Sequence, residues 1–339
     1  ANDVDNVFRY TTSSLSSSTA IAASTYISVA TSPGAALQEY TISDITSVAR
    51  AKKQSTGLFT IATADTAVVS SSPDQAITFN VGDSLNAVAA KFNAVKATTG
   101  IAASVIKIGD NSFQLSFSAT ATGEDADFDF NNLDVPGTLD DAADGVFDEI
   151  TITTQQAASN AEFDFNGTAV VRQTNAISDI VTGVTFTILQ TTPVGPPSTE
   201  LTISVEPDTD IAQSGIINFI NAYNDLKVFA ARQTEIGSDG VFTEEAVLNG
   251  SAALRTSLNA ITSHLSSIVM GITGSDLNRL ADIGILSADL PESEENPLVR
   301  NILNIDEDQL AQALSSNFDG VRKLFEFDFV SNNPNLRIF

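Results

Sequence analysis

The residues best suited to chemistry in this sequence are its single histidine, His264, and its many carboxylates. A His–Asp–Ser relay needs a histidine as its base, and His264 is the sole candidate. It stands between Ile261 and Leu265, beside the apolar stripe of an expected helix, where a solvated histidine is the ordinary interpretation. Without cysteine the chain has neither disulfides nor thiolate metal sites, and one histidine is too few for a histidine-based zinc site.

A stretch without lysine or arginine runs from Ile108 to Val171. Within it lie two clusters of carboxylates: Glu124, Asp125, Asp127 and Asp129, then Asp140, Asp141, Asp144, Asp148 and Glu149. Carboxylates at alternate positions can share one strand face and bind calcium, but the spaced ligands, central glycine and terminal glutamate of an EF-hand are missing. Nothing nearby supplies the substrate cleft that a catalytic carboxylate pair needs. We expect solvated negative surface, with calcium binding as the alternative.

The sequence offers no other catalytic pattern. It has no Gly-rich phosphate loop, no serine nucleophile elbow and no HExxH motif. We therefore expect no enzyme activity, no cofactor and no metal. The net charge of −26 repels phosphate, so we expect neither nucleic acid nor membrane as a partner. No apolar run approaches the roughly 18 residues of a membrane span, and residues 1–3 do not open a signal peptide.

The residues before about 200 alternate between apolar and polar in short runs that are typical of half-buried strands. Examples are 76–81, 112–117 and 184–189, separated by turn signals such as Ser32-Pro33-Gly34 and Asn166-Gly167. One helix interrupts them, capped by Asp83 or Ser84, with apolar residues at helical spacing until Gly100. The segment 192–198, rich in proline and glycine, is expected to be a linker between two halves.

Helical periodicity follows the expected linker. A first helix is capped within 208–210, a second runs from about Ser251 to Gly271, a third begins near Asp306, and a fourth follows Asp319-Gly320. The first two carry apolar stripes that we expect to pack against each other or against a second subunit. The candidate packing and oligomer face consists of Ile216, Phe219, Ile220, Tyr223, Leu226, Leu254, Leu258, Ile261 and Leu265. The expected fold class is α+β and multidomain, with a β-rich part followed by a helical bundle.

Segments in one consistent order resemble the FliD family of flagellar filament-capping proteins. Residues 38–51 resemble its GxYxIxVxxLAxAQ strand, 85–106 its SLxxIxxxIN…GVxASVI unit, and 113–123 its YRLxLxSxxTG end. The most specific segment, 161–186, resembles AxFxxNGxxxxRxSNxIxDxxxGVTL. Its motif residues here are Asn166, Gly167, Arg172, Asn175, Asp179 and Gly183. Segments 205–226, 248–258, 280–285 and 305–325 match later patterns. The resemblance covers roughly 35–326, and the family's terminal heptad segments are absent.

The resemblance implies a cap subunit at the tip of the flagellar filament that promotes flagellin folding and polymerisation. It implies a homo-oligomeric ring, with flagellin and the filament end as partners, an export chaperone, and export through the flagellar channel to the cell exterior. Host mucin or surface glycans are further ligand candidates. Chain order suggests nested head domains: an inner head of 1–59 plus 151–198, an outer head of 60–150 with one helix, and a helical leg of 199–339.

Three other classes of protein fit parts of the sequence. A bacterial surface adhesin would have a similar β-rich sequence with many threonines and serines up to residue 198. The helical part that follows does not fit an adhesin. A flagellin-like or other hook-associated filament subunit would share composition and nested domains. A carbohydrate-active enzyme is disfavoured, because four tyrosines and no tryptophan leave few aromatic platforms.

Overall fold

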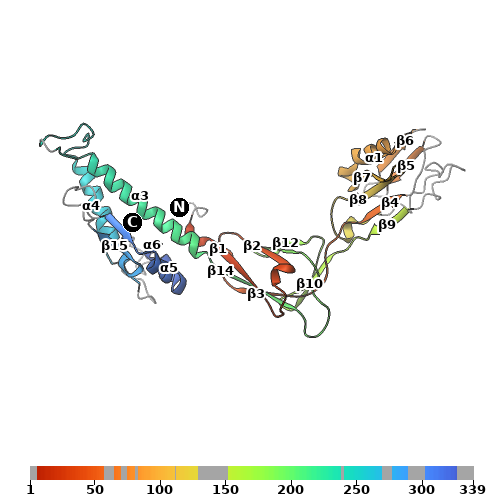
Figure 1. Ribbon diagram of the computed structural model, residues 1–339, viewed down its shortest axis with the longest axis horizontal. Helices are drawn as coiled ribbons and strands as arrows, with labels where there is room; N and C mark the ends of the chain where they lie inside the picture. The colour runs from red at the N-terminus through yellow and green to blue at the C-terminus, as the bar shows by residue number, and fades with distance from the viewer. Residues whose placement is uncertain are drawn as a thin grey trace, which may run out of the picture. The chain divides into compact units, whose positions relative to one another are not determined.

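The structure is a computed structural model that describes residues 6–56, 65–69, 75–80, 83–110, 112–128, 152–237, 240–268, 277–288 and 302–326. The chain divides into two compact units. The β unit comprises residues 13–206, and the helical unit comprises residues 1–12 and 207–339. The described strands form several separate sheets, and the expected class, α+β with a β-rich part followed by helices, is confirmed (Figure 1).

Two sheets build the first part of the β unit. One has five strands in the order β1 (Thr11–Ser17), β14 (Glu200–Pro207), β3 (Glu39–Ser47), β10 (Ala161–Phe165) and β11 (Thr168–Arg172). The other has three strands in the order β12 (Ala176–Val181), β13 (Val184–Ile188) and β2 (Ile27–Thr31). Every second residue of β13 and β14 is buried, as the alternating sequence predicts, so each sheet presents one apolar face.

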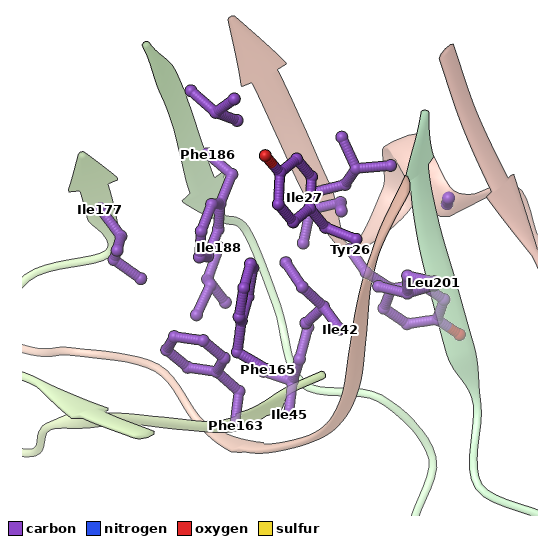
Figure 2. Close-up of a cluster of buried hydrophobic side chains, with 14 of the residues drawn as sticks. Tyr26, Ile27, Ile42, Ile45, Phe163, Phe165, Ile177, Phe186, Ile188 and Leu201 are labelled. Carbon is purple, nitrogen blue, oxygen red and sulfur yellow. The ribbon is translucent and has the colours of Figure 1, made fainter. Parts of the chain in front are cut away.

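The apolar faces of these two sheets share one core, which Figure 2 shows in close-up. Phe186 of β13 stacks on Phe165 of β10 at 5.8 Å between ring centroids and meets Phe163 edge-on at 5.7 Å. Ile27, Ile42, Ile45, Ile177, Ile188, Leu201 and Ile203 complete the most deeply buried set. Such aromatic pairs add about 0.5–1.5 kcal/mol each beyond their area burial, so the rings fix how the two sheets meet.

Strand β3 is bent by a bulge, because its residues 43–47 face only 162–164 of β10. Asp44 lies in the bulge with a positive φ of 47°. The buried Thr192 closes the gap: the Ile45 N–H donates to Thr192 Oγ1, and the Thr192 N–H donates to the Ile45 carbonyl, both at 3.0 Å. The segment 192–198 therefore joins β13 to β14 inside one unit. The expected linker between two halves is wrong, because one end of this Pro-rich loop is pinned to a central strand.

Thr192→Val is expected to lower the free energy of unfolding of the β unit by about 1–3 kcal/mol. The substitution keeps the shape of the side chain but leaves the buried Ile45 N–H without its acceptor. Urea unfolding followed by circular dichroism measures the change. The same substitution at the exposed neighbour Thr191 is the control, and equal losses at the two positions would contradict the role given to Thr192.

A second core lies in the remainder of the β unit. A four-stranded sheet has the order β7 (Ile101–Gly109), β8 (Ser112–Ala119), β4 (Lys53–Thr56) and β9 (Ile152–Gln156), and β5 (Asp65–Val69) pairs with β6 (Gln75–Phe79). The helix α1 (Leu85–Ala94) packs on β7 and, with the sheet, buries Val88, Phe92, Leu115 and Phe117 among others. The short α2 (Lys96–Thr99) follows and ends at Gly100 in the left-handed conformation, as expected.

The start of α1 is fixed by two polar residues, and of the two expected caps, Asp83 and Ser84, the structure selects Ser84. The Ala87 N–H donates to Ser84 Oγ at 3.2 Å, so Ser84 is the helix cap. Asp83 accepts from the Asn80 N–H at 2.8 Å and pairs with Lys91. These two interactions, the backbone hydrogen bond first, hold the pKa of Asp83 below its usual value.

The helical unit is organised around α3 (Thr209–Arg232), which Asp208 caps as expected. Its core contains the hairpin β15 (Ile285–Ala288) and β16 (Ile302–Ile305), the helices α5 (Glu307–Ser316) and α6 (Phe318–Phe325), and the short helices η2 (Val7–Arg9) and η6 (Leu280–Ile283). The helix α4 (Ala252–Ser266) begins at its expected cap, Ser251. Among the described helices, none combines the length and apolarity needed to cross a membrane.

Three boundaries differ from those expected. β14 pairs with β3, so the helical unit begins near 207 and not at 199. Residues 1–12 group with the helices, because Phe8 enters the helical core. The last helix begins at Phe318 with Asn317 as its cap, before the glycine that we expected to precede it. Gly271, the expected end of α4, lies outside the described residues. The division into three domains stays a prediction.

Candidate assembly surfaces

The residues considered for catalysis belong to different units or lie outside the described residues. His264 is exposed on α4, beside the apolar stripe, as the sequence indicates. Of the acidic stretch, Asp127 pairs with Lys52 at 2.9 Å, and Glu124 accepts from the Asn160 side chain at 3.0 Å. Asp129, Asp140, Asp141, Asp144, Asp148 and Glu149 lie outside the described residues. Within the ranges that the structure describes, no group of three or more acidic residues or histidines is placed to bind a metal.

The family-motif residues Asn166 and Gly167 form the two-residue turn between β10 and β11. Both have positive φ, 48° and 75°, the backbone that an Asn-Gly hairpin turn requires. Asn166 also bridges to β3, where its Oδ1 accepts from the Thr41 N–H at 2.8 Å. The turn therefore sets the register of β10 and attaches it to the centre of the five-stranded sheet.

Three other motif residues tie the second sheet to its surroundings. Asn175 exchanges two hydrogen bonds with the backbone of Ala49, donating to its carbonyl at 2.9 Å and accepting from its N–H at 2.7 Å. Arg172 of β11 pairs with Asp179 of β12 at 3.0 Å and so joins the two sheets. The motif is therefore a framework that holds sheets together, and nothing in its geometry makes it a catalytic site.

Gly183, the last motif residue, lies in the turn between β12 and β13 with a φ of 81°. A Cβ at this position would lie 2.9 Å from the Cα of Ala35, so a side chain cannot be placed without moving backbone. The glycine lets the β12–β13 turn approach the loop before β3, where the Ser32 N–H donates to the Gly183 carbonyl at 2.8 Å.

A polar junction connects the two cores of the β unit, and sequence reasoning missed it. Gln173 accepts from the Asp125 N–H at 3.2 Å through its side chain and from the Thr122 hydroxyl at 2.6 Å through its carbonyl. Asn160 accepts from the Glu124 N–H at 2.8 Å. The Gly123 N–H donates to the Arg50 carbonyl at 3.2 Å. In the sequence, only Thr122-Gly123 pointed to this place, and it was identified there as part of a family-like segment and not as a junction.

A groove beside this junction is lined by Thr46, Ser47, Val48, Arg50, Gln155, Gln156, Ala157, Ala158, Ser159 and Thr191. Several of its polar side chains have partners: the Ser47 hydroxyl donates to the Asn160 carbonyl at 2.7 Å and the Ser159 hydroxyl to the Val48 carbonyl at 2.8 Å. The Gln156 amide donates to the Ala51 carbonyl at 2.6 Å. The groove is thus held open by internal hydrogen bonds.

The expected packing and oligomer face of the helices separates into two parts. Ile216, Ile220 and Tyr223 are buried in the helical core. Phe219 and Leu226, on the same helix, are 45% and 40% exposed. On α4, Leu254, Leu258 and Leu265 are half-buried and Ile261 is exposed, so the packing of this stripe against α3 or a second subunit stays a prediction. The spacing of the apolar residues predicted the helix correctly. Of the four stripe residues, Leu265 alone packs, partly buried, against the described helical core.

The fold identifies the class of protein first. A family model described as "Flagellin hook IN motif" matches residues 59–121. The solved structure of the D1-D2-D3 domains of the flagellar cap protein FliD from Escherichia coli is similar in fold, with a TM-score of 0.60 and 24% sequence identity. That similarity covers 93% of this chain and 82% of the solved one. The chain therefore has the multidomain architecture of a flagellar cap protein.

The family follows from the sequence. The family model described as "Flagellar hook-associated protein 2 C-terminus" matches residues 158–334, slightly more than half of the chain, and the chain belongs to this family. The A-type flagellar hook-associated protein 2 of Pseudomonas aeruginosa is 28% identical over 273 residues, 75% of this chain and 53% of the relative. The Salmonella typhimurium protein is 28% identical over 246 residues, 68% and 47% of the two chains.

The chain thus spans about half the length of these two relatives. The resemblance identified from the sequence is confirmed. The comparisons do not favour the surface-adhesin alternative, because the family model extends from the β unit through the helical unit.

Proposed function

We propose that this protein is a structural subunit of the cap at the distal end of the bacterial flagellar filament, where it promotes the folding and polymerisation of flagellin. The family match over residues 158–334 carries this proposal. The whole protein would act in the flagellum, outside the cell, as a homo-oligomeric ring with flagellin and the filament end as its partners. An export chaperone, the flagellar secretion channel as the route, and mucin or glycan ligands stay predictions of the resemblance.

The fold supports a mechanical role. In the β unit, named side chains and two turn glycines connect the sheets through backbone hydrogen bonds and one ion pair. Such connections resist deformation because each donor and acceptor would lose its partner if the sheets separated. The helical unit supplies apolar side chains that its described core leaves uncovered. A firmly connected β unit and uncovered apolar side chains on the helical unit suit a subunit that keeps its shape while it binds its neighbours.

Deletion of the gene that encodes the protein tests the proposal. Cells without it are expected to shed unpolymerised flagellin into the medium and to swim poorly, with hooks still present, because filaments would lack the cap under which flagellin assembles. Immunoblots of the medium and electron microscopy of the cells measure both effects, and the full-length gene on a plasmid is the control. Filaments of normal length in the deletion strain would overturn the proposal, and hookless cells would indicate a different hook-associated subunit.

A further inference from the structure

The dipeptide Asn-Gly occurs twice in the sequence, at Asn166-Gly167 and at Asn249-Gly250. An asparagine before a glycine can react with its own backbone, because glycine has no Cβ to keep the next backbone nitrogen away from the asparagine side chain. The reaction needs a side chain that can turn toward this nitrogen and a nitrogen that is not engaged in a hydrogen bond. The two dipeptides have the same chemistry, so their surroundings in the fold decide which of them reacts.

Asn249 is free to react. It lies in the turn before α4, where both Asn249 and Gly250 are exposed. Among the described residues, the Asn249 side chain has no hydrogen-bond partner, and the Gly250 N–H donates to no acceptor. Gly250 has a φ of 77°, and a Cβ built on it would meet nothing within 4 Å, so the turn has room to change its conformation. The side chain and the nitrogen are therefore both available.

Asn166 is held away from the same reaction. Its Oδ1 accepts from the Thr41 N–H at 2.8 Å and from the Thr41 hydroxyl at 3.3 Å, and its own N–H donates to the Thr41 carbonyl at 2.9 Å. The turn is also closed by paired strands, since Phe165 of β10 lies opposite Thr168 of β11. Turning the side chain toward the Gly167 nitrogen would break both of its hydrogen bonds, so the reactive geometry is rarely reached.

We propose that Asn249 is a site of spontaneous deamidation, whereas Asn166 stays intact in the folded protein. The Gly250 nitrogen attacks Cγ of Asn249, and the new C–N bond closes a succinimide ring. The bond between Cγ and Nδ2 breaks, and the side-chain nitrogen leaves as ammonia with the proton of the Gly250 N–H. Water from the solvent then adds to one of the two ring carbonyls and opens the ring. Opening on one side gives aspartate, and opening on the other gives isoaspartate, in which the main chain runs through the former side chain.

The products change the start of α4 in two ways. Either product brings a carboxylate into residues 246–275, which contain no aspartate or glutamate. Isoaspartate also lengthens the main chain by a methylene group inside the turn that the Ser251 N–H closes onto the Leu248 carbonyl at 3.0 Å. Ser251 caps α4 by accepting from the Leu254 N–H at 3.3 Å, so isoaspartate at position 249 loosens the first turn of this helix.

Ageing of the folded protein in mildly alkaline buffer at physiological temperature, followed by digestion and mass spectrometry, tests the proposal. The peptide with Asn249 is expected to deamidate about ten times faster than the peptide with Asn166, and to contain both aspartate and isoaspartate. In urea the two rates should become similar, because the fold alone protects Asn166. Equal rates in the folded protein, or a faster reaction at Asn166, would overturn the proposal. Aspartate without isoaspartate would overturn the succinimide step.

Two variants provide the second measurement. Gly250→Ala places a methyl group beside the attacking nitrogen and is expected to slow the reaction at Asn249 about tenfold, while the slow reaction at Asn166 stays unchanged. Asn249→Asp has the charge of the product without the longer main chain. Hydrogen exchange at Leu254 and Arg255 should therefore quicken in the aged protein and not in Asn249→Asp. An unchanged deamidation rate in Gly250→Ala would contradict the attack by the Gly250 nitrogen, and equal exchange in aged protein and Asn249→Asp would contradict the loosening by isoaspartate.

Discussion

Ile220→Asp is expected to remove a large part of the stability of the helical unit. Ile220 is 1% exposed, in the middle of α3, among the apolar residues of the helical core. The substitution removes the packing of the isoleucine side chain and buries a carboxylate away from solvent. Together these two effects lower the free energy of unfolding by about 4 kcal/mol or more. A domain of this size has only about 5–15 kcal/mol in total. Hydrogen exchange should show loss of protection in α3 and α5.

Leu258→Asp is the matched control for this substitution. Leu258 lies on an apolar stripe, as Ile220 does, but it is half-buried and does not belong to the described core. The loss should therefore be about 1 kcal/mol, from helix propensity and partial desolvation. Protection of β10 and β13 should persist in both variants, since their core lies in the other unit. Equal destabilisation by the two substitutions would show that α4 is part of the core.

The contrast between these two leucine- and isoleucine-rich helices shows what periodicity can predict. The spacing of apolar residues placed both helices, and Asp208 and Ser251 marked their first residues. It also predicted correctly that Ile216 and Ile220 share one face. Periodicity does not say what covers a face, because burial depends on elements distant in sequence. The hairpin β15–β16, which the sequence analysis did not predict, covers part of α3, where the Asn224 side chain donates to the Leu303 carbonyl at 2.9 Å.

The error at 192–198 has a similar physical origin. Proline and glycine disfavour regular structure locally, and this is why the segment resembled a linker. The hydrogen bonds between Thr192 and Ile45 join residues 147 positions apart, and composition contains no information about such a contact. By contrast, the turn at Asn166-Gly167 and the helix end at Gly100 were predictable, because each depends on the backbone preference of one or two residues.

Gly123→Ala should be the most damaging small substitution in the β unit. Gly123 has φ 93° and ψ 162°, a conformation essentially restricted to glycine, in which another residue is strained by about 1–3 kcal/mol. A Cβ would also lie 2.8 Å from the Cα of Gln173. The loop that bonds to Gln173 and Asn160 must then move, and the junction between the two cores loses hydrogen bonds. We expect a total loss of about 3 kcal/mol in the free energy of unfolding of the β unit.

Gly167→Ala separates the two causes of this loss. Gly167 also has positive φ, 75°, but a Cβ there would meet nothing within 4 Å. Its substitution should cost about 1 kcal/mol, the strain of a left-handed alanine alone. Hydrogen exchange should quicken at Gly123 and Arg50 in Gly123→Ala and stay unchanged there in Gly167→Ala. If both variants lose the same stability, the Gln173 loop adapts freely. In that case the polar junction does not hold the two cores in place, because its contacts yield to a single methyl group.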